Sequence, residues 1–213
     1  MTNTYIQLTE TVGQIEDKIN AALAEDINLL LNKKKARIES KCKALVSNWI
    51  VSQPEMMSLR SPTPDSLSGQ FGLRPGEDET AVKDIVASVE DSVSAKFVKL
   101  DKKLRGGIDI YFQPSNFLNL LGLTSGHVYY ERGDLHWLSW LLEEGDNIIV
   151  VNYTYNPSTG LGRSRLGNMK ESGGVFRVPP EFSGIRANNF ITRALIGSAQ
   201  EKDIFDVIKR ELQ

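Results

Sequence analysis

The sequence predicts an α+β fold with a long N-terminal helix, an extended arm, and a small antiparallel sheet flanked by helices. Apolar residues recur at steps of three and four from residue 8 to residue 50, which is typical of one face of a helix. Proline, serine and glycine then become frequent, and beyond them strand-like alternation is mixed with helix-like spacing. We therefore expect a long helical segment at 1–51, an extended arm or linker at 52–76, and an α+β domain at 77–213.

The composition is that of a folded protein without a strong net charge. The chain has 213 residues, and its 25 basic and 27 acidic side chains give a formal charge of −2. Contact with nucleic acid or an anionic membrane would therefore have to be local. The first residues lack the basic start and apolar core of a signal peptide, and no apolar run approaches the ~20 residues that span a bilayer. The single cysteine, Cys42, favours a reducing compartment, so we expect synthesis in the cytoplasm and no membrane partner.

One apolar stripe predicts the N-terminal helix. No proline interrupts it before Pro54, and Thr9 followed by Thr11 and Val12 offers a plausible start, so we expect one long helix or two abutting helices. Acidic residues gather in its first half and basic residues in its second, an order that suits the helix dipole. The basic run is either a solvated face or a docking surface for an acidic partner or DNA; it consists of Lys33, Lys34, Lys35, Arg37, Lys41 and Lys43.

The proline-rich segment 52–76 is more apolar than a flexible linker needs to be. An arm that lies on a neighbouring subunit would explain its apolar side chains, which are Met56, Met57, Leu59, Leu67, Phe71 and Leu73. A loop packed on its own domain is the alternative.

The remaining elements follow from local patterns. Helical spacing predicts a helix at 81–93, and two alternating runs around a turn at 101–107 predict a β-hairpin. We expect a short helix capped by Ser115 or Asn116 and stopped by Gly122, and another capped by Asp134 and ended at Gly145. A buried strand is expected at 146–157, a further strand at 173–182, and one or two helices from 188, with a weak point at Gly197.

The segment between these two strands is glycine-rich and basic, and we interpret 156–174 as a mobile loop. It lacks the Gly-Lys-Ser/Thr ending of a phosphate loop and leads into a strand instead of a helix. Its Arg163, Arg165 and Lys170 are candidates for contact with an acidic partner or with DNA. A plain disordered loop is the alternative.

The sequence offers no cluster of reactive side chains, so we expect neither catalytic residues, nor a cofactor, nor a metal. Cys42, His127 and His136 do not form any arrangement that binds zinc. No Gly-x-Ser-x-Gly motif is present, and neither histidine lies in a motif that would activate a nucleophile. An enzyme would instead require a pocket that collects His127, His136 and Asp134.

The C-terminal half resembles the neck or tail-completion proteins (head–tail connectors) of long-tailed bacteriophages. The resemblance rests on the order of GRSRLGNM, GGVFRVPPEFSG and NNFITRALIGS, preceded by RGGIDIYFQPSNFLNLLGL and GDLHWLSWLLEEGDNIIVVNY. That family commonly joins N-terminal helices to a small antiparallel sheet, with a loop analogous to 162–164 before its late strands. The long N-terminal helix and the arm depart from the simpler members, so head-completion adaptor, tail-completion protein and tail terminator all stay open.

The resemblance implies a structural virion protein that forms a homo-oligomeric ring in the neck. Its partners would be the portal or adaptor protein on one side and the tail-tube or terminator protein on the other. Rings need contacts between unlike faces of identical subunits. Arg163 and Arg165 would then face the lumen and contact packaged DNA without reading its sequence. A cytoplasmic nucleic-acid-binding module that uses the basic run at 33–43 is a further alternative.

Overall fold

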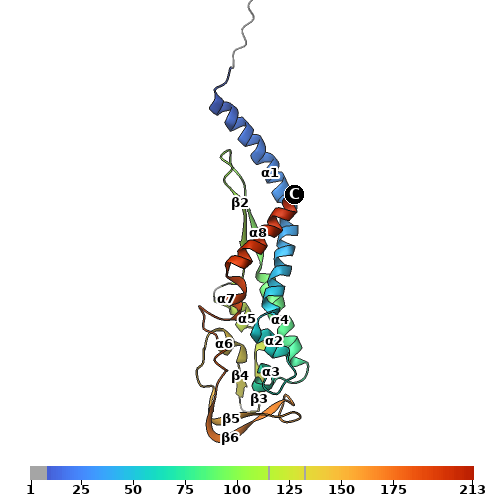
Figure 1. The fold of residues 1–213 in the computed structure, drawn as a ribbon, viewed down its shortest axis with the longest axis vertical. Helices are drawn as coiled ribbons and strands as arrows, with labels where there is room; N and C mark the ends of the chain where they lie inside the picture. The colour runs from blue at the N-terminus through green and yellow to red at the C-terminus, as the bar shows by residue number, and fades with distance from the viewer. Residues whose placement is uncertain (1–8, 115, 132) are drawn as a thin grey trace, which may run out of the picture.

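The computed structural model describes residues 9–114, 116–131 and 133–213, and it shows a long, narrow molecule (Figure 1). Its elements are α1 (Val12–Val51), α2 (Pro54–Arg60), α3 (Leu67–Phe71), α4 (Glu77–Ser92), β1 (Ser94–Val98), β2 (Gly107–Tyr111), α5 (Leu118–Leu121), the 3₁₀ helix η1 (Thr124–Gly126), β3 (Val128–Tyr130), β4 (Gly133–Leu135), α6 (Trp137–Leu142), β5 (Val150–Pro157), β6 (Gly167–Phe176), α7 (Phe190–Leu195) and α8 (Ser198–Leu212). The α+β class and the long N-terminal helix are confirmed.

Helix α1 is continuous over 40 residues. It begins with a capping box, in which the Thr11 side chain accepts from the Gln14 N–H and the Gln14 side chain accepts from the Thr11 N–H. Its C-terminal half buries Ile38, Val46 and Ile50 completely. Its N-terminal half projects beyond the body together with the β1–β2 hairpin, and we call this part the distal end (Figure 1).

Residues 52–76 do not extend as an arm, which corrects the prediction. They form α2 and α3, because Pro54 occupies the first turn of α2, where a proline needs no N–H partner, and Ser66 caps α3. Met56, Leu59, Leu67, Phe71 and Leu73 lie in the chain's own core, whereas Met57 is 62% exposed. The second interpretation, a segment packed on its own domain, therefore describes five of these six side chains.

The core of the body lies between α1, α4 and the helices that follow. α4 begins at Glu77, four residues before the predicted start, and buries Ala81, Ile85 and Val89. Phe71 stacks on Trp137 with ring centroids 5.4 Å apart, so α3 and α6 are joined by an aromatic contact. Burial of such large side chains is the main source of stability in a domain of this size.

The strands form three separate two-stranded antiparallel sheets, not one sheet. The predicted hairpin is confirmed, with Ser94 opposite Tyr111 and Val98 opposite Gly107. The strand predicted to be buried corresponds to β5, which is largely exposed because, among the described residues, it pairs with β6 alone and no second layer covers it. β6 begins at Gly167, so the predicted loop 156–174 shortens to residues 158–166.

The chain ends in two helices, with the break at Gly197 where the weak point was predicted. Asn189 caps α7 and is fully buried, and its amide also donates to the Leu142 carbonyl oxygen at 3.1 Å. α8 packs along α1 and reaches Arg37, which pairs with Glu211 at 2.8 Å. Across the described ranges, no helix is both long and apolar enough to cross a membrane.

Candidate functional site

The end opposite the distal end, which we call the base, carries a groove between three segments. Its walls are formed by the turn before α4, by β3 and its turn, and by the tip of the β5–β6 hairpin. The basal groove is lined by Arg74, Pro75, Tyr129, Tyr130, Glu131, Arg163 and Arg165. Tyrosine and arginine are the residues most often found at the energetic centres of protein interfaces.

Arg163 anchors the hairpin tip and does not project freely from it. Its guanidinium donates to both carboxylate oxygens of Glu77 at 3.1 Å and to the Tyr129 carbonyl oxygen at 2.7 Å. It also lies 5.7 Å from the centre of the Tyr130 ring. Glu77 is the first residue of α4, so this pair ties the tip to the helix start and offsets the arginine charge.

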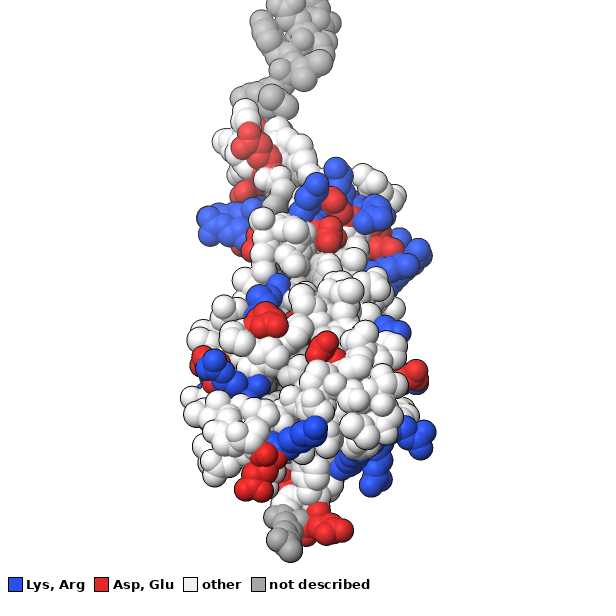
Figure 2. Space-filling view, turned by 60° about the horizontal axis from the view of Figure 1, so that its bottom comes forward, with Lys and Arg blue, Asp and Glu red and all other residues white. Residues whose placement is uncertain are grey.

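The other two predicted contact residues are placed differently. Arg165 is exposed in the same groove and has a left-handed backbone with φ of 62°. Lys170 lies in β6 opposite Thr154 and is not part of the groove. Figure 2 shows basic and acidic side chains interspersed on the face that it presents. Contact of Arg165 and Lys170 with DNA stays a prediction.

Two histidines meet beside the groove. The rings of His127 and His136 stack with centroids 3.9 Å apart, and His127 Nδ1 lies 2.7 Å from Asp134 Oδ2. Asp134 is therefore not the cap of α6: it lies in β4, and α6 begins after His136. Burial lowers the pKa of His136 because a protonated ring would be poorly solvated there, and the neighbouring His127 lowers it further.

The structure thus brings together the three polar residues that an enzyme was expected to collect. An Asp–His pair can orient an imidazole for general-base work. Within the part of the chain that the structure describes, neither ring is hydrogen-bonded to a hydroxyl or thiol that it could activate. The described residues also contain no group of three or more His, Cys, Asp or Glu side chains that could hold a metal ion.

At the distal end, α1 carries apolar side chains that no described residue covers. Val12 is 70% exposed, Ile19 54% and Leu23 45%. Together with the half-buried Ile15, they follow one face of the helix at steps of three and four, and we call these four residues the distal stripe. Contiguous exposed apolar side chains are typical of protein-binding surfaces, so the distal stripe is a candidate for one.

Two side chains of α1 hydrogen-bond the β1–β2 hairpin: Glu39 accepts from the Ala95 N–H at 2.9 Å, and Asn28 bonds the hairpin loop. Asn28 donates to the Leu100 carbonyl oxygen at 3.1 Å and accepts from the Leu100 N–H at 2.8 Å. Lys102 pairs with Asp17 at 3.6 Å further along. The hairpin therefore covers one side of the projecting helix and leaves the distal stripe open on another.

Sequence reasoning missed several of these residues. Glu77 and Arg163 lie 86 positions apart, and Asn28 and Leu100 lie 72 apart, so no local pattern connects them. Tyr129 and Tyr130 were detectable only as an aromatic pair in a short strand. The exposed distal stripe was predicted as an apolar face, but its lack of cover was not.

No known protein family, curated protein or solved structure matches this chain.

Proposed function

We propose that the protein is a structural protein of a tailed-phage virion, a ring-forming neck component that joins head and tail. The observation that supports this most directly is the presence of two unlike uncovered surfaces at opposite ends of a long molecule. One is the apolar distal stripe on α1, and the other is the aromatic and arginine-rich basal groove. A ring-forming connector needs unlike surfaces of this kind, because it binds a neighbour along the virion axis and also the next copy of itself.

The two surfaces suit different contacts. The distal stripe is a row of aliphatic side chains on a helix, which packs on another helix or in a groove. The base offers exposed Tyr129 and Tyr130 beside an anchored arginine, together with the exposed Val151–Val175 pair of the β5–β6 sheet. A two-stranded sheet with an exposed apolar face gains stability when it is covered.

The choice of a tailed-phage neck as the assembly rests on the resemblance of the sequence motifs. The motifs that carry it lie in the body and the base: GRSRLGNM at the anchored hairpin tip, the strand and turn of GGVFRVPPEFSG, and α7 in NNFITRAL. We assign the base to one neighbour along the virion axis and the distal end to assembly with further subunits. Tail terminator and other tail structural roles fit the same two-surface geometry.

The test is a stop codon early in the gene in the phage that encodes the chain. We expect full heads and finished tails to accumulate unjoined, with joined particles restored when the wild-type chain is supplied from a plasmid. Electron microscopy and plaque counts give the readout. Normal joined particles in the absence of the protein would contradict the proposal.

A further inference from the structure

The charges on α1 are divided between two segments of the helix. Residues 10–26 contain five acidic side chains and one basic side chain. Residues 33–43 contain six basic side chains and one acidic side chain. The two segments lie on one continuous helix, so each copy of the chain carries both members of a complementary pair.

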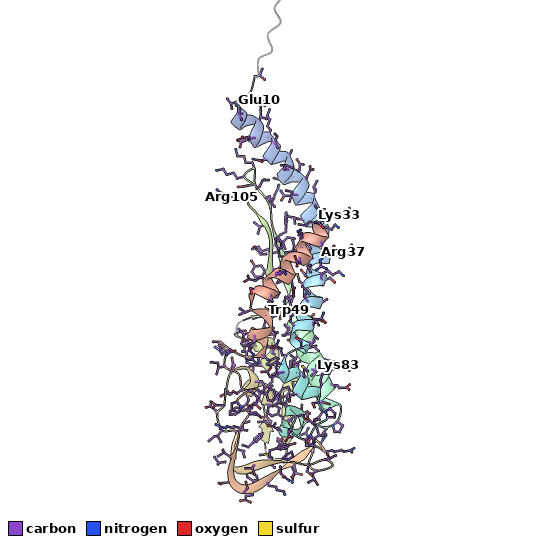
Figure 3. All side chains as sticks on the ribbon, viewed as in Figure 1. Glu10, Lys33, Arg37, Trp49, Lys83 and Arg105 are labelled. Atoms are coloured by element: carbon purple, nitrogen blue, oxygen red, sulfur yellow. The ribbon has the colours of Figure 1, made fainter. Side chains whose placement is uncertain are left out.

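Part of this charge lies on the same face as the distal stripe. Beyond Leu23, steps of three and four lead along this face to Asp26 and Leu30. The next positions on it are Lys33, Arg37 and Lys41. Figure 3 shows Lys33 and Arg37 on the side of α1 away from the hairpin tip that carries Arg105. Along this face of α1, the apolar distal stripe with its acidic neighbours is therefore followed by a row of basic side chains.

Contacts within the chain leave most of these charges available. Asp17 pairs with Lys102, Lys18 with Glu10, and Arg37 with Glu211. By contrast, no described residue forms an ion pair with four exposed side chains of this face and its border, Glu16, Asp26, Lys33 and Lys41.

We propose that neighbouring copies of this chain contact each other through α1, with the acidic, apolar distal half of one helix beside the basic row of the next. The inference rests on the proposed function, because it names the contact through which the ring closes. Two parallel helices in register would set like charges side by side. An offset of 17 residues, roughly 25 Å of helix, sets opposite charges together instead.

This offset contact also provides cover for the apolar side chains. Lysine and arginine lay their aliphatic stems along apolar surface while their charged ends stay in water. The stems of Lys33, Arg37 and Lys41 can therefore cover the distal stripe of a neighbour, with their charged ends beside Glu16 and Asp26. Because the contact joins unlike patches of identical chains, it is heterologous. It closes into a ring when neighbouring helices are inclined to one another, so that the offset runs around the ring and does not add up along its axis.

The experiment reverses each charge set separately in the full-length chain. One variant is Glu16→Lys/Asp26→Lys, the other is Lys33→Glu/Lys41→Glu, and the combined variant carries all four changes. Light scattering and sedimentation over a dilution series measure self-association, and unfolding midpoints confirm that each monomer is folded. We expect each double variant to weaken self-association at least tenfold, and the combined variant to restore it to within about threefold of wild type.

Mixing the two double variants gives a second readout. In one variant both patches of α1 are basic, and in the other both are acidic, so each repels copies of itself. In a mixture every contact between unlike variants joins a basic patch to an acidic patch, so the mixture should assemble. A matched control, Ile196→Ser, changes an exposed side chain outside α1 and should leave assembly unchanged.

Several results would overturn this inference. One is a wild-type oligomer whose mass is insensitive to both reversals, which leaves the virion proposal intact because the stop-codon test addresses it separately. Another is a wild-type chain that stays monomeric at every concentration. A third is salt-dependent binding of duplex DNA that is lost in Lys33→Glu/Lys41→Glu while the mass stays the same, which would assign the basic row to nucleic acid.

Discussion

The two halves of α1 lie on one helix, yet their apolar side chains meet different surroundings. Ile38, Val46 and Ile50 are fully buried under the body, whereas Val12 and Ile19 are mostly exposed. The difference lies in what covers the helix, since α4, α7 and α8 pack on the second half and only the β1–β2 hairpin accompanies the first. A helix pattern therefore predicts apolar rows, while elements far away in the sequence decide which of them are buried.

A matched pair of substitutions on α1 should show the largest difference between the two halves. Ile38→Ala should cost about 2–5 kcal/mol of unfolding free energy because it leaves a cavity in the core. Ile19→Ala should change it by less than about 0.5 kcal/mol, since that side chain is exposed in the monomer. Urea unfolding at a concentration where the chain is monomeric gives both values. Equal losses would mean that the distal half is covered within the chain.

A second pair of substitutions tests whether residues 52–76 belong to the core of the chain itself. Met56 is fully buried and its neighbour Met57 is exposed, so Met56→Ala should destabilise by about 2–5 kcal/mol and Met57→Ala by less than about 0.5 kcal/mol. Thermal and urea unfolding distinguish the two. If Met56→Ala left stability unchanged and weakened assembly, the segment would be a subunit-binding arm after all.

At the base, we expect the loss of the Arg163 contacts to have a local effect on the hairpin tip. Arg163→Ala removes the contacts to Glu77 and to the Tyr129 carbonyl, and should cost about 1 kcal/mol because the pair is partly exposed. Hydrogen exchange of residues 158–166 should become faster while that of α1 stays the same. Arg165→Ala is the control, and we expect it to leave exchange unchanged. Equal effects of the two changes would argue against an anchored tip.

The smallest expected effect is a pH dependence at the same end. The lowered pKa of His136 means that the unfolded chain binds a proton at a higher pH than the folded chain does. Its contribution to stability is therefore present above about pH 6.5 and is lost as the pH falls through the folded pKa. Melting temperatures between pH 7.5 and roughly pH 5 should fall less in His136→Gln than in wild type. An identical fall of the melting temperature in both proteins would exclude His136 as the source of the pH dependence.

Local signals explain which parts of this fold were predictable. Thr11 and an uninterrupted apolar stripe predicted α1, the alternation around 101–107 predicted the β1–β2 hairpin, and Gly197 marked the break before α8. Segment 52–76 was misjudged because Pro54 was interpreted as a helix breaker, although a proline also fits the first turn of a helix.

The candidate site was less predictable because its contacts are distant in sequence. Arg163 was identified from loop composition, but its partner Glu77 belongs to another element. Asp134 looked like a helix cap, and only the pairing of β3 with β4 brings it to His127. The exposure of β5 could not be inferred either, because an apolar strand looks the same whether or not a second layer covers it.

The most direct test of the central claim, a chain with two uncovered ends that assembles with copies of itself, is its mass in solution. Light scattering on the purified full-length protein, alone and with the virion proteins encoded beside it, gives this value. We expect a closed oligomer whose mass is a multiple of 23.8 kDa, formed by the chain alone. A particle of 23.8 kDa at every concentration of the chain alone would contradict this.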